Sequence, residues 1–370
     1  MELFWTCLLT IAVAVAGGFL FTKIKAPAPF MVGSMFAVAA LSVCTGLGYF
    51  PDALRPVTQS VAGSFIALSI QPENVKELRS VIKPYFVMVP GMLIINILLG
   101  LSMYYFCGMD ISTALFSSVP GGIMDISLIC ADMGANTSQV AIMQTARLLF
   151  VMLLFPPMLK TLANRTLKKQ QAEGQATAQD APASQPDAVA EDIPVEKYAA
   201  LTRRQQVLYT FITLAIGGVG GFIGYKLAIP AGTMTFSLLF AAAFNLITRR
   251  AYMPVFVRQA AQVGSGALIG AGLTLADILA MRTIIVPAII LIFGYVIMNL
   301  GLGYIIYKAK MLDLTTALFA TTPAGASDMA LIADELGASG PKVSVLHIAR
   351  IITVVALFPS VIALVIGAVT

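Results

Sequence analysis

Apolar segments of about 20 residues recur along nearly the whole chain, and short loops between them hold most of the charged side chains. In the first half they lie near residues 3–22, 30–50, 57–71, 84–107, 113–131 and 139–160, and the second half repeats them. Segments of this length and composition predict membrane-spanning α-helices, because the strands of a membrane barrel are shorter and alternate apolar with polar positions. We therefore expect an all-α polytopic membrane protein.

A long polar stretch interrupts this pattern at residues 163–204 and is rich in Gln, Ala, Pro, Asp and Glu. Such a composition buries too little apolar surface to offset the entropy of ordering, which predicts a flexible cytoplasmic linker. The linker would join a first membrane repeat, residues 1–162, to a second, residues 205–370.

The two sides of this linker match at a constant offset of 203 residues, which indicates a duplication. From Asp110 to Pro156, 19 of 47 positions are identical to the positions 203 residues later. The same offset pairs Lys23 with Lys226 far upstream. A duplication of the whole chain predicts that both halves contain the same set of helices.

The fifth apolar segment of each half is interrupted in its middle. The tripeptides found there are Pro120-Gly121-Gly122 and Pro323-Ala324-Gly325. Proline removes a helical hydrogen bond and glycine weakens a helix, so a continuous helix is not expected. The segment is either a broken span or a re-entrant hairpin that enters and leaves on one side.

The loop charges favour the hairpin. With hairpins, each half has an odd number of spans, so the halves lie inverted in the membrane. A cytoplasmic linker then places 18 Lys and Arg residues inside and three outside. If each half has six spans, 13 lie inside and eight outside. Because positive loops stay in the cytoplasm, we predict two inverted repeats of five transmembrane helices, each with a re-entrant Pro-Gly hairpin. Secondary transporters often have this plan, with the solute site near the bilayer midplane.

Composition restricts the function further. The chain is 58% hydrophobic and 11% charged, whereas about a quarter of the residues in soluble proteins are charged. Its basic residues flank apolar segments rather than forming a patch, so we expect no nucleic-acid partner. Four cysteines and one histidine without ligand spacing predict no metal site and no cofactor. No nucleophile, base and orienting group occur in a recognisable set, so an enzyme is not expected.

The two Pro-Gly tips are the first candidates for a solute site. Irregular backbone at membrane depth is tolerated where it is packed in protein or lines a wet cavity, and a helix N-terminus attracts anions. Each tip is therefore either a tight packed turn or a binding element. Asp125 and Asp328 follow in the first turn of the next helix. They either cap that helix, or bind a coupling ion or carry a proton.

Arg147 and Arg350 lie within the last apolar segment of each half. An arginine inside a membrane helix needs an anionic or polar partner. One alternative is a structural ion pair, for which the candidate acids are Asp125, Asp328, Asp132 and Glu335. The other is a carboxylate or phosphate of the solute, bound by the two-pronged guanidinium.

Three further side chains are weaker candidates. Asn96 and Asn299 lie in the middle of the fourth apolar segments, where amides also join helices to one another. His347 replaces Gln144 of the other half, and we interpret it as a packed polar side chain in preference to a proton relay.

The duplicated tips, the following Asp, the Gly-Ala pairs at 134 and 337, and the Ala-Arg pairs at 146 and 349 resemble the AbrB membrane-protein family. The resemblance covers both halves. This family is often labelled "putative ammonia monooxygenase", an activity that the lack of a metal cluster makes physically implausible. More distantly, the pattern is similar to the cation-proton antiporter/anion transporter superfamily, which includes sodium symporters for citrate and glutamate. That similarity implies a transport function, and the implication rests on analogy of fold alone.

We therefore expect a secondary active transporter in a bacterial cytoplasmic (inner) membrane. It would move a small anionic solute, coupled to Na⁺ or H⁺, through a site between the two tips. The alternative is a membrane-embedded regulator or scaffold that controls gene expression indirectly through the linker. The expected partners are a small-molecule solute and the lipid bilayer, and a homodimer is left open.

Overall fold

The computed structural model describes residues 2–24, 28–172, 202–275, 281–324, 326–336 and 338–369. Over these residues the chain is helical and contains no strand, which confirms the predicted all-α class.

The described helices of the two halves follow the same order, with α15 and α16 together matching α7. Those of the first half are α1 (Glu2–Lys23), α2 (Pro29–Thr45), α3 (Arg55–Leu68), α4 (Pro72–Cys107), α5 (Ile111–Ser118), α6 (Ile123–Asp132) and α7 (Thr137–Ala172), with a 3-10 turn, η1 (Asp52–Leu54), before α3. Those of the second half are α8 (Arg203–Lys226), α9 (Gly232–Thr248), α10 (Val255–Ala271), α12 (Met281–Lys308), α13 (Leu314–Thr321), α14 (Ala326–Glu335), α15 (Gly340–Ala356) and α16 (Phe358–Val369). The bounds of α2, α5 and α6 recur 203 residues later in α9, α13 and α14. The sequence duplication is therefore also a duplication of helices.

Five of the described helices are long and apolar enough to cross a membrane, namely α1, α4, α7, α8 and α12. Together α15 and α16 make a sixth candidate, bent by 46° where they meet. α2 and α9 are apolar but have 17 residues each. Length and composition therefore support a polytopic membrane protein with five or six spans, and they do not confirm the predicted ten.

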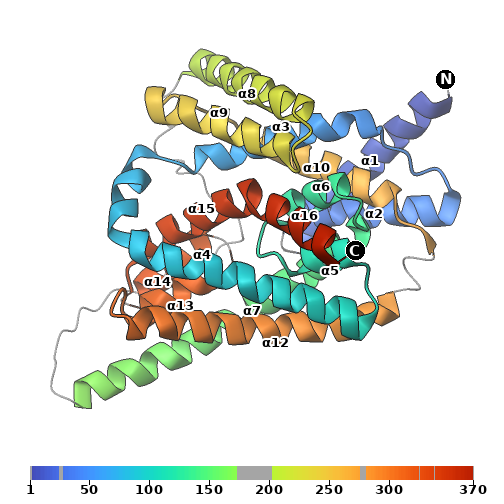
Figure 1. Cartoon of the computed structure of the whole chain (residues 1–370). Coiled ribbons are helices and arrows are strands. Elements are labelled where there is room, and N and C mark those ends of the chain that lie inside the picture. The colour runs from blue at the N-terminus through green and yellow to red at the C-terminus, as the bar shows by residue number, and fades with distance from the viewer. Residues whose placement is uncertain are drawn as a thin grey trace.

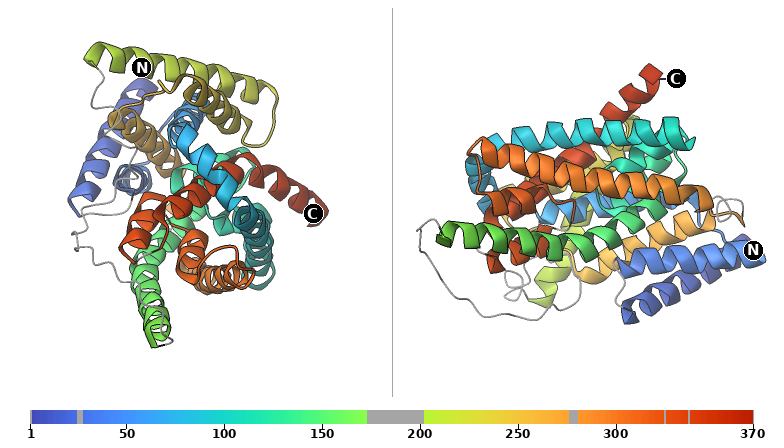
Figure 2. Two further views of the ribbon diagram at one scale, coloured as in Figure 1. Left: turned by 90° about the vertical axis from the view of Figure 1, so that its left-hand side faces the viewer. Right: turned by 90° about the horizontal axis from the view of Figure 1, so that it is seen from below.

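The helices form two groups, and each group contains helices from both halves (Figures 1 and 2). In Figure 1 the upper group consists of α1, α2 and α3 with α8, α9 and α10, and the lower group of α4 to α7 with α12 to α16, where α6 reaches up beside α10. The groups meet through α6 and α7 against α10, α6 against α3, and α15 against α9. The fold thus has two helical bodies that do not coincide with the two sequence halves.

Within the upper group the halves exchange helices: α2 packs on α10, and α9 packs on α3. Glycines make both crossings close. A Cβ atom at Gly63 would lie 2.3 Å from the carbonyl oxygen of Met234, and one at Gly266 would lie 2.5 Å from that of Met31. Close backbone approach of this kind is typical of helix packing in membranes.

The structure changes one detail of the predicted linker. Helix α7 continues to Ala172 and projects away from the body in Figure 1, so residues 163–172 are helical. Leu, Lys, Gln and Ala favour a helix, and no Pro or Gly interrupts them there. Residues 173–201 lie outside the described part of the chain, and the predicted domain limits stay predictions.

Candidate functional site

The interruption expected in the fifth segment is present between α5 and α6. Helix α5 is capped at its N-terminus by Asp110, whose carboxylate accepts a hydrogen bond from the Thr113 amide at 2.9 Å. It ends before Val119, which is extended (φ −74°, ψ 130°). The amide of Gly121 donates to the Val119 carbonyl across the buried Pro120 at 3.0 Å. The segment 119–122 is therefore a tight non-helical connection inside the protein.

Gly121 and Gly122 have no unusual φ, and a side chain at either position would meet neighbouring side chains of α6. Gly122 has φ −67° and ψ 144°, which any residue adopts. A Cβ atom at Gly122 would lie 2.5 Å from a carboxylate oxygen of Asp125, and one at Gly121 would lie 2.5 Å from the Ile126 side chain. Asp125 is partly buried in the first turn of α6, so its carboxylate lies against the broken segment.

The second break repeats this geometry between α13 and α14. Thr322 is extended (φ −66°, ψ 128°), and the Ala324 amide donates to its carbonyl at 2.9 Å across the buried Pro323. Gly325 lies outside the described residues. Asp328 is in the first turn of α14, and its side chain is likewise outside the description.

Arg147 extends from α7 to the first break. Its Nη1 donates to the Val119 carbonyl at 2.9 Å and its Nη2 to the Gly121 carbonyl at 2.6 Å. These carbonyls flank Pro120, where the helix break leaves backbone acceptors without helical partners. Arg147 is only 3% exposed, so it stabilises the interruption from inside the protein.

Arg350 makes the same pair of contacts in the second half. From α15, its Nη1 donates to the Thr322 carbonyl at 2.7 Å and its Nη2 to the Ala324 carbonyl at 2.9 Å. It is also 3% exposed. The two arginines are therefore equivalent in sequence, in burial and in their hydrogen bonds.

These contacts bear on the two alternatives for the arginines, a structural ion pair or a bound solute anion. Asp132 accepts a hydrogen bond from Gln59 of α3 at 2.7 Å and lies 3.8 Å from Arg55, so its described partners are not Arg147 or Arg350. An ion pair with Asp125 stays a prediction. The side chains of Asp328 and Glu335 lie outside the description.

Arg147 lies beside Tyr295 of α12. The guanidinium carbon of Arg147 is 5.7 Å from the Tyr295 ring centre, and the fully buried tyrosine donates its hydroxyl to the Ser118 carbonyl at 2.6 Å. The Nε atoms of both arginines are buried without a hydrogen-bond partner. Two like charges with free donors make this region complementary to an anion.

Gln144 and His347 occupy equivalent positions one turn before the arginines. Nε2 of Gln144 donates to the Phe116 and Val119 carbonyls, both at 3.0 Å. Nε2 of His347 lies 3.0 Å from the Phe319 carbonyl, and its buried Nδ1 has no partner. Both side chains therefore hold carbonyls at the end of a short helix.

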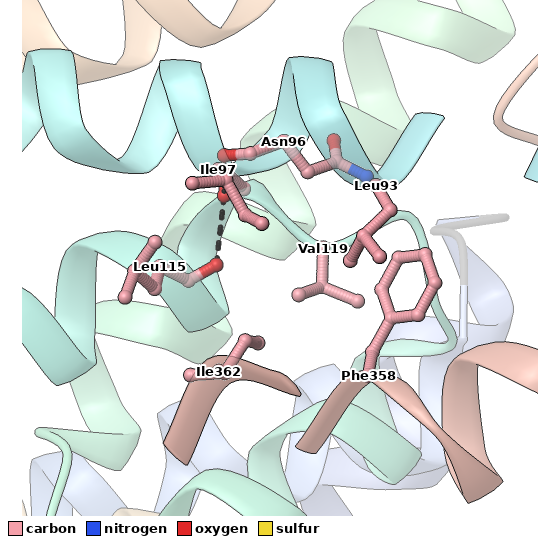
Figure 3. Close-up of a pocket in the computed structure, with 8 residues that line it drawn as sticks. Leu93, Asn96, Ile97, Leu115, Val119, Phe358 and Ile362 are labelled. Carbon is pink, nitrogen blue, oxygen red and sulfur yellow. Dashed lines mark hydrogen bonds between the residues drawn. The ribbon is translucent and has the colours of Figure 1, made fainter. Parts of the chain in front are cut away.

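Asn96 and Asn299 differ strongly. Nδ2 of the buried Asn299 donates to the Leu318 carbonyl at 2.9 Å and to the hydroxyls of Thr321 and Thr322 at 3.1 and 3.0 Å. Asn96 is 2% exposed, and neither atom of its amide has a partner. Side chains of α4, α5 and the start of α16 surround it (Figure 3).

The structure adds Tyr295 to the candidate site residues, which sequence reasoning missed. Met92 is its partner 203 residues earlier, so a search for identities between the halves passes over it. A tyrosine in an apolar helix also carries no signal that separates a site from a core. Among the described residues, no three His, Cys, Asp or Glu side chains are grouped so as to hold a metal ion.

Comparison with known proteins identifies the family. Residues 30–366 match the family described as "Transition state regulatory protein AbrB". The chain belongs to the AbrB family. It is 27% identical over 368 residues to the "Uncharacterized protein YhjN" of Bacillus subtilis (strain 168), which covers 94% of this chain and 90% of that protein.

A second relative agrees with this assignment. The chain is 24% identical over 366 residues to the "Putative regulator AbrB" of Escherichia coli (strain K12), which covers 96% of this chain and 95% of that protein. The similarity to the AbrB family that the tip motifs indicate is therefore confirmed.

Proposed function

We propose that this AbrB-family chain is a secondary active transporter of a small anionic solute, coupled to Na⁺ or H⁺, in a bacterial inner membrane. Its solute site would lie near the midplane, between the two broken segments. One observation carries the proposal. Arg147 and Arg350, one from each half, are buried at equivalent helix breaks, and the Nε of each has no hydrogen-bond partner.

Two buried like charges are costly unless an anion compensates them. Each guanidinium already uses both Nη atoms on carbonyls and keeps its Nε free. A carboxylate or phosphate offers several oxygens to such donors, and charge-assisted hydrogen bonds are stronger than neutral ones. An anionic solute therefore fits this region better than a neutral or cationic one.

We further propose that the two halves lie inverted and that each break is the tip of a re-entrant hairpin. The loop charges support this orientation, and the reciprocal packing of α2 on α10 and α9 on α3 is what a two-fold relation between the halves produces. Movement of the lower group of helices against the upper group would open the site to each side in turn. The carboxylates of Asp125 and Asp328 are the proposed ligands of the coupling ion.

Thermal stability of the purified full chain tests this proposal, because a ligand that binds only the folded state raises its melting temperature. We expect a small carboxylate or a phosphate to raise it, with a larger effect in the presence of Na⁺ or at lower pH. The same anion should have little effect on Arg147→Met. A solute that stabilises wild type and Arg147→Met equally would contradict an arginine site.

The alternative is a membrane regulator that acts through the linker, and the printed name of the Escherichia coli relative favours it. Deleting residues 173–201 and replacing them with a Gly/Ser linker of equal length separates the two. A transporter should keep its solute uptake, whereas regulation through the linker should be lost. No chemical step is proposed for any of these side chains, so the proposed function is not enzymatic.

A further inference from the structure

A polar contact joins the two helical groups between α3 and α6. The buried Gln59 of α3 donates its Nε2 to the Asp132 carboxylate at 2.7 Å and to the Leu128 carbonyl at 3.1 Å, both in α6. Nη1 of Arg55, also in α3, lies 3.8 Å from the other oxygen of the same carboxylate. Because α3 belongs to the upper group and α6 to the lower group, this contact crosses the boundary along which the groups would move.

Asp132 lies at the far end of the α5–α6 segment, away from the break. The amide of Asn136, just before α7, donates to the Thr113 hydroxyl in the first turn of α5 at 3.0 Å. The two ends of the segment therefore lie together, as a re-entrant hairpin requires. The side chains of Arg55 and Asp132 are 28% and 32% exposed. The contact is thus at the surface end of the segment, and the break held by Arg147 is at its inner end.

The geometry of this contact suits repeated opening and closing. A partly exposed ion pair at 3.8 Å contributes little to stability, because water screens it. Arg55 has a second carboxylate partner, Asp52 of η1, at 2.9 Å, so it keeps a compensating charge when α3 and α6 separate. The amide of Gln59 would exchange its bond to Asp132 for a bond to water.

The second half has the same residue types at the same offset. Arg258, Gln262 and Glu335 follow the three side chains of the first contact by 203 residues, with Glu in place of Asp. The first two belong to α10, and Glu335 ends α14, with its side chain outside the description. In the proposed orientation the start of α3 is periplasmic and the start of α10 is cytoplasmic. The two sets would therefore lie on opposite sides of the membrane.

We propose that these two sets are gates, that is, contacts that close the path from the solute site to one side of the membrane. The Asp132 gate closes the periplasmic side, and the Glu335 gate closes the cytoplasmic side. One opens while the other is closed, because a site open to both sides at once would dissipate the driving ion gradient. This inference rests on the proposed transport function and concerns access to the site, not what the site binds.

The exposure of a thiol behind each gate tests the inference without a solute. Leu128 is fully buried and lies one turn before Asp132 on the same face of α6, so Leu128→Cys places a thiol behind the first gate. Leu331→Cys is its equivalent in the second half. Each is made in the full chain with the four native cysteines replaced by alanine. The measurement is the rate at which a charged methanethiosulfonate reagent modifies the purified protein in detergent.

The decisive variant is Asp132→Ala, which removes the carboxylate from the first gate. We expect it to raise the modification rate of Leu128→Cys by about fivefold or more and to lower that of Leu331→Cys by a similar factor, because it shifts the population toward the state open on the first side. Local loosening around Asp132 would raise the first rate and leave the second unchanged. That result would overturn the proposal, as would unchanged rates at both positions.

Two further variants are matched controls. Asp52→Ala removes the other partner of Arg55 but no contact between the groups, so both rates should stay unchanged. Asp132→Glu keeps a carboxylate, the type found at position 335, and should also leave both rates unchanged. Equal effects of Asp52→Ala and Asp132→Ala would contradict the proposal. The anion site at Arg147 and Arg350 has its own binding test, so a failure of the gates is distinguishable from a failure of the proposed function.

Discussion

Arg147 and Arg350 each hold a helix break with one guanidinium, which in the proposed transporter would also bind the anion. The Nη atoms hold the carbonyls on either side of a buried proline, and the Nε remains free for a ligand. A lysine at either position keeps the charge but lacks the planar fork that reaches both carbonyls.

The first prediction concerns this fork. Arg147→Lys and Arg350→Lys should each weaken binding of the solute anion by about tenfold or more and lower the free energy of unfolding by about 1 kcal/mol, the usual contribution of one hydrogen bond. Affinity and melting temperature measured on the single variants check both parts. An unchanged affinity in both variants would exclude a role in binding.

A second prediction follows from the carbonyl partners of Arg147. In a buried ion pair, neutralising both partners restores the stability lost by neutralising one. Here Arg147→Met combined with Asp125→Asn should be no more stable than Arg147→Met alone, because the partners of Arg147 are carbonyls. Recovery of the melting temperature in the double variant would show that the two charges are coupled after all.

A third prediction concerns the space at Gly122. A side chain there meets the Asp125 carboxylate, so Gly122→Leu should abolish solute uptake while membrane insertion persists. Gly301→Leu is the control, because a Cβ atom at Gly301 has no neighbour within 4 Å. Normal uptake by Gly122→Leu would mean that this tip is only structural. The same change at Gly325 stays a prediction from sequence.

Residue types and their spacing predicted some of these features and not others. Prolines and glycines at equal offsets mark the breaks, because no continuous helix accommodates them. The sequence does not show that the arginines bind backbone carbonyls, because every residue has a backbone carbonyl and none is marked as a partner. The Asn299 amide donates to a carbonyl and two hydroxyls whereas the Asn96 amide has no partner, a difference that appears only once the side chains are packed.

Among the elements, the predicted interruption of the fifth segment appears in the structure as two short helices in each half. The count of spans was less predictable. α3 and α10 contain polar residues such as Gln59 and Gln262, and they pack against the apolar helices α9 and α2, so tertiary contacts and not length determine their place. The hydropathy pattern does not predict that α2 packs on α10 and α9 on α3.

A fourth prediction tests this exchange. Gly63→Ala and Gly266→Ala place a methyl group against the backbone of the facing helix and should destabilise the protein by about 1–3 kcal/mol each. Gly218→Ala, in α8 with no neighbour within 4 Å, should be neutral or stabilising, because alanine favours a helix. The melting temperatures of the three variants measure these effects. Equal effects at Gly63 and Gly218 would show that the crossing of α3 and α9 is looser than described.

At the scale of the whole molecule, each of the two helical groups contains helices from both sequence halves, so neither group can form from one half alone. The proposed inverted orientation makes a fifth prediction: both termini are periplasmic and the linker is cytoplasmic. Reporter fusions after Glu2, Gly174 and Thr370 locate each point. A cytoplasmic N-terminus would favour parallel halves with six spans each.

The most direct test of the account is solute uptake by the full chain in proteoliposomes, with an imposed Na⁺ or proton gradient and a panel of small radiolabelled carboxylates. Arg147→Met and Arg350→Met are compared with wild type and with Gly301→Ala. The account predicts gradient-dependent accumulation of at least one carboxylate by wild type and Gly301→Ala, and loss of accumulation in both arginine variants. Persistent accumulation in both arginine variants would contradict it. So would a wild-type protein that accumulates none of the carboxylates under either gradient.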